Sequence, residues 1–141
     1  MARELLSTCG VPMKKVLVAD DTKMMRQLAL AYLKHFECAV VEAENGREAL
    51  NLARSEHPDL ILLDVSMPEM DGPDVLRALR GDPTTEGIPA IMMTGHSSKA
   101  MVVETLRLGV RGYLTKPLKR DRFDREMRKW LPAIPPPTSE T

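Results

Sequence analysis

The sequence predicts a doubly wound α/β domain, in which helices cover both faces of a five-stranded parallel sheet. The first observation is that short apolar runs alternate five times with longer segments of helical period. The second is that hydrophobicity within each run is continuous rather than alternating, which is typical of strands buried on both faces. The expected strands span residues 15–19, 39–43, 60–64, 89–93 and 111–115.

The helices are expected between these strands and after the last one. Apolar residues spaced three and four positions apart predict one core-facing stripe on the first and on the last helix. These residues are Met25, Leu28, Ala29, Tyr32 and Phe36 in the first helix, and Phe123, Met127 and Trp130 in the last.

Capping residues, glycine and proline predict where the other helices begin and end. Asn45 with Glu48 three positions later indicates the start of the second helix. Gly72-Pro73 opens the third helix, because proline suits the first turn. Gly109 follows a fourth helix that should end near Leu108.

The strand order follows from the handedness of parallel crossovers. Right-handed connections leave few arrangements for five βα units, and we favour the flavodoxin-like order 2-1-3-4-5. This order makes the first and third strands neighbours, at the point where the direction of winding reverses. Ligands bind at such a point in open α/β sheets.

Length and composition fit a single domain. Of the 141 residues 43% are apolar, which is enough for a hydrophobic core. We expect an N-terminal extension over residues 1–12, one domain over residues 13–131, and a proline-rich tail or linker start over residues 132–141. The last segment cannot hold a helix or a central strand, because proline lacks the backbone N–H.

Polar residues stand where four of the predicted strands end. Asp20 and Asp21 follow the first strand, Asp64 ends the third, Thr94 follows the fourth, and Lys116 follows the fifth. The carboxyl ends of parallel strands lie along one edge of the sheet, so these side chains are expected to converge.

The chemistry of this set points to a cation and a phosphoryl group. Three carboxylates about 4 Å apart repel each other by roughly 4 kcal/mol per pair at an effective dielectric constant of 20, so the site requires positive charge. Oxygen ligands without histidine or cysteine suit Mg²⁺. Lys116 supplies a second cation, Thr94 a hydroxyl donor, and Asp64, which stands alone at its strand end, is the expected nucleophile.

Each of these residues has an ordinary interpretation when taken singly. Asp20 and Asp21 are more often helix caps than metal ligands, and a lone Asp64 suits a turn. Thr94 and Lys116 would be common surface groups. Their conjunction at four strand ends favours the functional interpretation.

Charge and cysteine content limit the classes of partner and compartment. The 20 basic and 20 acidic residues cancel, which argues against nonspecific nucleic-acid binding. Cys9 and Cys38 lack the spacing of a disulfide scaffold or a zinc site. The N-terminus is not a signal peptide and no apolar run reaches membrane-spanning length. We therefore expect a cytoplasmic protein that does not bind membranes.

The motifs resemble a response-regulator receiver domain of two-component signalling, of the chemotaxis-regulator type. The resemblance runs from about Lys14 to Leu131. Its motifs are Val16-Leu17-Val18-Ala19-Asp20-Asp21, Leu62-Leu63-Asp64-Val65-Ser66-Met67-Pro68-Glu69-Met70-Asp71-Gly72, Ile91-Met92-Met93-Thr94-Gly95 and Gly112-Tyr113-Leu114-Thr115-Lys116-Pro117.

The resemblance implies a phosphoacceptor domain rather than an enzyme with an external substrate. Asp64 would take a phosphoryl group from a histidine kinase, a phosphotransfer protein or a small phosphodonor. Asp20, Asp21, Asp64 and the backbone carbonyl of Ser66 would hold Mg²⁺, with Asp20 acting partly through water. The domain would catalyse only its own phosphorylation and dephosphorylation.

The resemblance also implies a switch and a partner surface. Thr94 would move toward the phosphoryl group and Tyr113 would follow, which remodels a face made by the fourth helix, fifth strand and fifth helix. That face would bind a downstream protein. The Lys116–Pro117 peptide bond would be cis, and Ser66 and His96 would tune the lifetime of the phosphate, with His96 giving its loss a pH dependence.

The fifth strand and last helix are strongly basic. Residues 111–130 contain eight basic and three acidic side chains, which suits either a solvated face or a docking surface. Because no output module follows in the sequence, nucleic acid is not an expected partner of this chain alone.

Three alternatives remain open at this point. An Asp-nucleophile phosphatase would carry its nucleophile after the first strand, with a second Asp two residues on, whereas Asp64 follows the third. A flavodoxin-like FMN carrier would present hydroxyls and amides, not Asp20-Asp21, to a phosphate. A receiver-shaped module that is never phosphorylated is the third alternative.

Overall fold

The computed structural model describes residues 13–96 and 98–134. Five strands alternate with five helices along this part of the chain. The elements are β1 (Lys14–Ala19), α1 (Lys23–Leu33), β2 (Cys38–Ala43), α2 (Gly46–Glu56), β3 (Leu60–Asp64), α3 (Gly72–Arg80), β4 (Ala90–Thr94), α4 (Lys99–Arg107), β5 (Gly112–Thr115) and α5 (Arg120–Met127).

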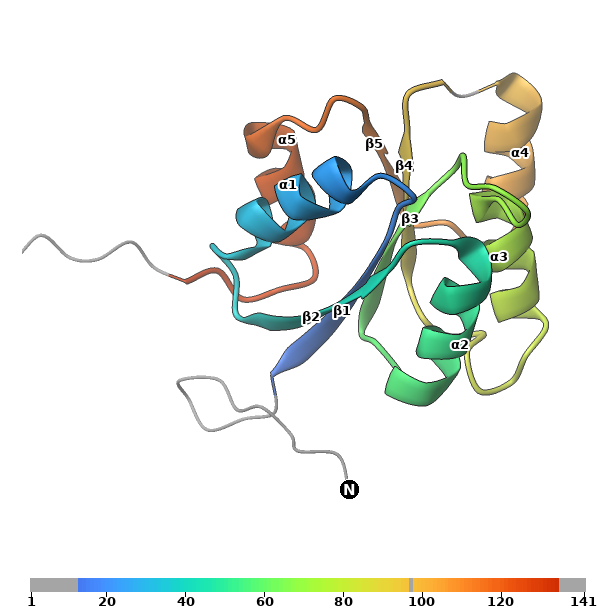
Figure 1. Ribbon diagram of the computed structural model, residues 1–141, viewed down its shortest axis with the longest axis horizontal. Coiled ribbons are helices and arrows are strands. Elements are labelled where there is room, and N and C mark those ends of the chain that lie inside the picture. Colours follow the sequence, from blue (N-terminus) through green and yellow to red (C-terminus); the bar gives the residue numbers. More distant parts are fainter. Residues whose placement is uncertain (1–12, 97, 135–141) are drawn as a thin grey trace, which may run out of the picture.

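The strands form one parallel sheet in the order β2-β1-β3-β4-β5, which confirms the predicted order. Helices α1 and α5 cover one face, and α2, α3 and α4 cover the other (Figure 1). The sheet is therefore the middle of three layers, and the flavodoxin-like prediction is confirmed.

Two hydrophobic clusters lie on the two sides of the sheet, because successive strand residues point to opposite faces. In β1, Leu17 and Ala19 belong to the cluster with α2 and α3, whereas Val16 and Val18 belong to the cluster with α1 and α5. Burial on both faces explains why the predicted strands were apolar without alternation.

Local signals for the helix boundaries are also confirmed. The side chain of Asn45 accepts a hydrogen bond from the backbone N–H of Glu48 at 2.8 Å, at the start of α2. Helix α3 begins at Gly72 and is preceded by Asp71, whose carboxylate accepts a hydrogen bond from the backbone N–H of Asp74 at 2.9 Å. Gly109 has a φ of +74°, a conformation that favours glycine after a helix.

Two residues of the predicted helical stripes lie outside their helices. Helix α1 ends at Leu33 and α5 at Met127, so Phe36 and Trp130 follow the helix ends. Phe36 is nevertheless buried in the α1–α5 cluster, and Trp130 packs against it. The apolar spacing persists because the chain still lies against the same core after the helix has ended.

The chain after α5 runs back to the start of β2. The backbone N–H of Glu37 donates to the Pro132 carbonyl, and that of Ile134 donates to the His35 carbonyl, both at 2.8 Å. These bonds flank an antiparallel bridge between Phe36 and Ala133. The start of the predicted tail thus pairs with the α1–β2 connection, while the predicted extension 1–12 and residues 135–141 lie outside the described residues.

The thiol of Cys38 is free, and burial raises its pKa to about 11. Among the helices of the described residues, none combines the length and apolar character needed to cross a membrane.

Candidate functional site

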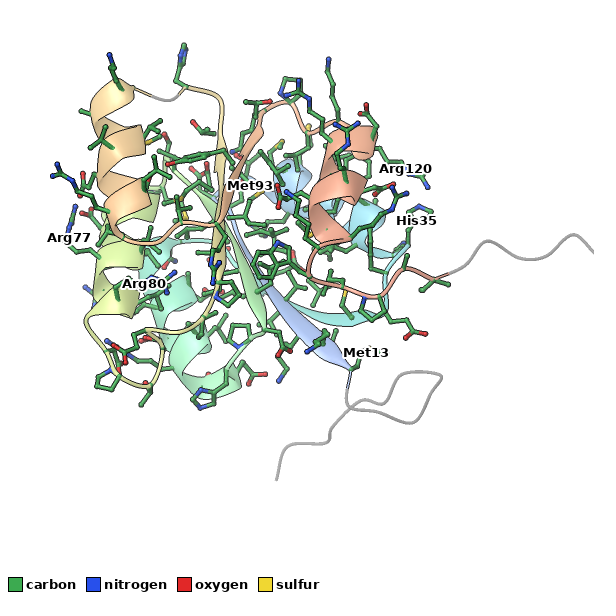
Figure 2. All side chains as sticks on the ribbon, turned by 180° about the vertical axis from the view of Figure 1, so that it is seen from behind. Met13, His35, Arg77, Arg80, Met93 and Arg120 are labelled. Atoms are coloured by element: carbon green, nitrogen blue, oxygen red, sulfur yellow. The ribbon has the colours of Figure 1, made fainter. Side chains whose placement is uncertain are left out.

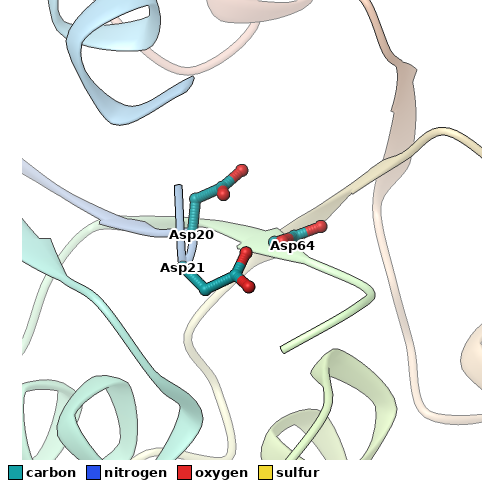
Figure 3. Close-up of side chains that lie close together, drawn as sticks. All are labelled: Asp20, Asp21 and Asp64. Atoms are coloured by element: carbon teal, nitrogen blue, oxygen red, sulfur yellow. The ribbon is translucent and has the colours of Figure 1, made fainter. Parts of the chain in front are cut away.

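Three aspartates meet where β1 and β3 end. Asp20 and Asp21 directly follow β1, and Asp64 is the last residue of β3, the neighbouring strand. One carboxylate oxygen from each residue lies within 4.8 Å of the others. Figure 3 shows the three side chains at the neighbouring ends of β1 and β3, along one edge of the sheet. The predicted acidic cluster is therefore present.

Lys116 brings its ammonium group to two of these aspartates. Its Nζ lies 2.9 Å from Asp64 Oδ1 and 2.9 Å from Asp20 Oδ2. The contact with Asp64 is a hydrogen bond, whereas the contact with Asp20 is an ion pair without hydrogen-bond geometry. The Lys116–Pro117 peptide bond is cis, as the resemblance implied.

Burial and the ion pairs between Lys116 and the aspartates shift the pKa values of these residues in opposite directions. Burial, assisted by the negative charge of Asp20, raises the pKa of Asp64 from 3.8 to about 6, despite the opposing hydrogen bonds from Lys116 and Ser66. Burial lowers the pKa of Lys116, but hydrogen bonding and the charges of Asp20 and Asp64 outweigh it, so that pKa is raised. At neutral pH the site holds a protonated lysine beside a partly desolvated carboxylate.

Backbone contacts that the sequence did not indicate hold Asp20 in place. Its Oδ1 accepts a hydrogen bond from the backbone N–H of Thr22 at 2.9 Å. The guanidinium of Arg26 donates to the Asp20 carbonyl at 2.7 Å and also pairs with Glu42 on β2. Arg26 thus fixes the turn between β1 and α1, although its place in the helical pattern gave no sign of this role.

The chain after Asp64 folds closely over the end of β3. The backbone N–H of Gly72 donates to the Val65 carbonyl at 2.9 Å. A Cβ at position 72 would lie 2.4 Å from the Asp64 carbonyl oxygen, so only glycine fits there. The backbone N–H of Ser66 donates to Asp64 Oδ1 at 3.3 Å, which further fixes the carboxylate.

Thr94 is buried at the end of β4, and its hydroxyl is turned to the following turn. Its Oγ1 donates to the His96 carbonyl and accepts from the His96 backbone N–H, at 3.0 Å for the latter bond. The structure therefore places Thr94 on the predicted edge without a hydrogen bond to Asp64. Its movement toward the site remains a prediction.

Tyr113 of β5 is joined to α4. Its hydroxyl shares a hydrogen bond with the buried Thr105 Oγ1 and also donates to the Val102 carbonyl at 3.4 Å. The sequence predicted a role for Tyr113 but did not indicate Thr105, since a threonine within a helix carries no distinctive signal. The connection links the edge of the sheet to α4.

The acidic cluster has the chemistry of a Mg²⁺ site. All candidate ligands are oxygens, which Mg²⁺ prefers. Asp20 Oδ2 is buried beside the Lys116 ammonium at 2.9 Å, and a carboxylate oxygen has a second lone pair that can accept a cation. Asp21 is exposed and offers a carboxylate at the rim. The residues present therefore fit the ion that the sequence predicted.

Comparison with known proteins agrees with this geometry. The model of the response regulator receiver domain matches residues 16–128. The chain belongs to the response regulator receiver domain family. The phosphatase and FMN-carrier alternatives are set aside by this match, and the function of a receiver domain in two-component signalling follows.

Individual receiver proteins match most of the chain. Protein PilH of Pseudomonas aeruginosa is 36% identical over 109 residues, covering 77% of this chain and 90% of PilH. The polar-differentiation response regulator DivK of Brucella ovis is 30% identical, covering 84% of this chain and 96% of DivK. The chemotaxis response regulator CheY4 of Vibrio cholerae superposes with a TM-score of 0.77 at 32% identity, covering 84% of this chain and 99% of the CheY4 chain.

Other relatives are longer than this receiver chain. The probable transcriptional regulator ycf27 of Cyanophora paradoxa is 36% identical over 128 residues, which cover 91% of this chain but 52% of that relative. The chain thus spans about half the length of this relative and nearly all of PilH.

Proposed function

We propose that this receiver domain accepts a phosphoryl group on Asp64 and passes the signal to a protein partner. The single observation that carries the proposal is the position of Lys116 Nζ, 2.9 Å from carboxylate oxygens of both Asp20 and Asp64, beside the acidic cluster. A lysine held by two buried carboxylates is suited to binding phosphoryl oxygens while one of those carboxylates reacts.

In the proposed reaction an oxygen of Asp64 attacks the phosphorus of a phosphohistidine or a small acyl phosphate. A P–O bond to Asp64 forms as the P–N or P–O bond of the donor breaks, and the leaving imidazole or carboxylate keeps the bonding electrons. Both hydrogen bonds found for this carboxylate among the described residues go to Oδ1, which favours Oδ2 as the attacking atom. Hydrolysis by water restores the carboxylate and releases inorganic phosphate.

Asp20, Asp21 and Asp64, with the Ser66 carbonyl, would hold Mg²⁺. When bound, this ion would offset the negative charge that accumulates as carboxylates and phosphate meet. Lys116 remains to bind a phosphoryl oxygen, and its raised pKa keeps it protonated through the physiological range.

The proposed output begins at Thr94 and Tyr113. If the Thr94 hydroxyl leaves the His96 carbonyl for the phosphoryl group, space opens beside β4 that Tyr113 can enter. Because Tyr113 hydrogen-bonds Thr105 of α4, its movement would alter the face formed by α4, β5 and α5. The proposed partners are therefore a histidine kinase or phosphotransfer protein as donor and a downstream protein at this face.

Ser66 and His96 are proposed to set the lifetime of the phosphate. Both are exposed and lie two residues beyond Asp64 and Thr94, respectively. Side chains at these positions would border the approach of hydrolytic water. Replacement of His96 with Ala should then flatten the pH dependence of phosphate loss, measured by the decay of the phosphorylated mass.

The experiment that tests the function is incubation with acetyl phosphate and Mg²⁺, followed by intact-mass measurement. Wild type should gain the mass of one phosphate, labile to hydroxylamine, and Asp64→Ala should not. Asp59→Asn is the matched control, because Asp59 lies just before the opposite end of β3. A wild-type protein that stays at its original mass would instead indicate a receiver-shaped module that is never phosphorylated.

A further inference from the structure

Helices α3 and α4 are neighbours on one face of the sheet (Figure 1). An open surface groove runs along α4, with Arg77 of α3 at its opposite edge. Its volume is about 650 Å³. Ala100 and Val103 of α4 and Leu108 supply the apolar part of the lining. Val103 is 43% exposed, which is unusual for a large aliphatic side chain in the middle of a helix that faces a neighbour.

The edges of this groove are basic. Its charged lining residues are Arg77, Lys99 and Arg107 against the single acid Glu104. Glu104 pairs with Arg77, which projects from α3 toward solvent (Figure 2), and Arg77 also contacts Asp74 at 2.8 Å. Lys99 and Arg107 form no ion pair with any residue from 13 to 96 or from 98 to 134.

The spacing of these two cations defines what would fit between them. Lys99 and Arg107 are the first and last residues of α4, so their Cα atoms are separated by roughly 12 Å along the helix axis at 1.5 Å per residue. An amphipathic helix with acidic residues two turns apart spans about the same distance. An aliphatic side chain between those acids would lie against Val103.

We propose that the α3–α4 groove docks an acidic amphipathic helix of a partner protein. Its acidic residues would pair with Lys99 and Arg107, and its central aliphatic residue would cover Val103. Charge complementarity favours this occupant over a basic segment, and the apolar floor favours it over a purely polar acidic tail. The groove lies on the α3 side of α4, because Arg77 of α3 lines it and none of its lining residues belongs to β5 or α5.

The test uses a fluorescein-labelled helical peptide of about 15 residues, with two glutamates two turns apart and a leucine between them. Fluorescence anisotropy is measured without Mg²⁺ or phosphodonor, so the outcome is independent of the proposed phosphorylation. Wild type should bind this peptide, and binding should weaken as salt is raised. A peptide with lysines in place of the glutamates should not bind.

Two variants of the groove test its charge and its apolar floor. The double variant Lys99→Glu/Arg107→Glu should weaken binding about tenfold or more, because attraction at both ends becomes repulsion. Val103→Gln should weaken binding about threefold without a change of net charge. Circular dichroism confirms that each variant remains folded.

The control variant Arg125→Glu/Arg128→Glu changes the net charge by the same amount as the double groove variant. Its two positions lie on α5 and immediately after it. It should bind the peptide like wild type. Equal weakening by this control would overturn the proposal, because peptide binding would then depend on the net charge of the protein or on α5 rather than on the groove. The proposal would also fail if wild type did not bind the peptide, or if sedimentation showed self-association that the groove variants abolish.

Discussion

The pKa of the Asp64 carboxyl group is shifted in opposite directions by its surroundings. Burial and the nearby Asp20 raise its pKa to about 6, whereas Lys116 and the Ser66 amide stabilise the ionised form. The folded protein therefore binds a proton at Asp64 more tightly than the unfolded chain does. Between the ordinary pKa of 3.8 and about 6, this residue makes the free energy of unfolding fall as pH rises.

Asp64→Asn removes this cost of ionisation and keeps the shape of the side chain. In buffer free of divalent ions we expect the variant to be more stable than wild type at pH 8, by about 1–2 kcal/mol. The difference should vanish only below about pH 3, where Asp64 is protonated in both the folded and the unfolded state. Urea denaturation at a series of pH values measures the free energy of unfolding.

Added Mg²⁺ should reduce the advantage of Asp64→Asn, because the ion stabilises the wild-type carboxylate cluster more than the variant. Asp59→Asn serves as a control for loss of an acid from the same region of chain and should show no gain at pH 8. A wild-type stability that rises from pH 5 to pH 8 in parallel with that of Asp64→Asn would contradict the inferred pKa.

Lys116 is the counter-charge of two buried carboxylates. Lys116→Met retains much of the aliphatic volume but leaves Asp20 and Asp64 without their cation, which should cost about 2–4 kcal/mol at neutral pH. Asp64→Asn should stabilise the Lys116→Met variant by more than it stabilises wild type, so a double-mutant cycle should give a coupling above about 0.5 kcal/mol. Additive effects of the two substitutions would show that the ion pair with Asp64 has no energetic role.

The residue types of the site were predictable because each polar group interrupts an apolar strand at its carboxyl end. Asp20, Asp21, Asp64 and Lys116 meet as expected. The direction of the Thr94 hydroxyl was not predictable, because two arrangements of a threonine at a strand end differ by one side-chain rotation. The contact of Arg26 with the Asp20 carbonyl is likewise set by packing rather than by a pattern.

Among the elements, the connection between β3 and α3 has the least freedom. The Cβ of an alanine at position 72 would meet backbone atoms, including the Asp64 carbonyl oxygen at 2.4 Å, which cannot move without displacing β3 or the connection. We expect Gly72→Ala to lower the free energy of unfolding by at least about 2 kcal/mol and to slow phosphorylation of Asp64.

Gly87→Ala is the matched control for this prediction. No atom lies within 4 Å of the position that its Cβ would take, so its stability should stay within about 0.5 kcal/mol of wild type. Urea denaturation and the rate of mass gain with acetyl phosphate provide the two measurements. If the two variants behaved alike, the close approach of Gly72 to Asp64 would be without consequence.

Helix α4 is tied to the sheet edge through Thr105 and Tyr113. Thr105→Val keeps the shape of the side chain but removes the hydroxyl that bonds Tyr113. Within residues 13–96 and 98–134, the Tyr113 hydroxyl then keeps its contact with the Val102 carbonyl alone. We expect a loss of about 1 kcal/mol and faster amide hydrogen exchange in α4.

The exchange experiment also reports on the proposed switch. Acetyl phosphate and Mg²⁺ should change amide exchange in α4 of wild type and should change it less in Thr105→Val. Thr115→Val on β5 is the control, because Thr115 is exposed and makes no side-chain hydrogen bond within the described residues. Equal responses in all three proteins would show that the bond between Thr105 and Tyr113 does not couple α4 to the phosphorylation site.

On the scale of the whole molecule, the right-handed crossovers between parallel strands limit the strand order. The strand order in turn determines which strand ends become neighbours. This is why residues as far apart as Asp20 and Lys116 could be assigned to one site from the sequence. The ends of α1 and α5 were less predictable, because Phe36 and Trp130 continue the apolar spacing beyond Leu33 and Met127. A core contact preserves the pattern whether or not the backbone is still helical.

The pairing of residues 132–134 with the α1–β2 connection could not be predicted, because proline-rich composition disfavours regular elements but does not exclude isolated backbone hydrogen bonds. The Pro132 carbonyl and the Ile134 N–H each form one such bond beside the buried Phe36. Removal of residues 132–141 should therefore lower the free energy of unfolding by about 1–2 kcal/mol, through loss of these bonds and exposure of Phe36.

Removal of residues 135–141 alone keeps both bonds and is the matched control. Urea denaturation should then show this shorter truncation within about 0.5 kcal/mol of the full chain. Equal stability of both truncations would place the boundary of the folded unit at Leu131. A loss confined to the longer truncation would extend that boundary to Ile134, because the backbone of residues 132–134 would then contribute to the same cooperative unit as α1 and β2.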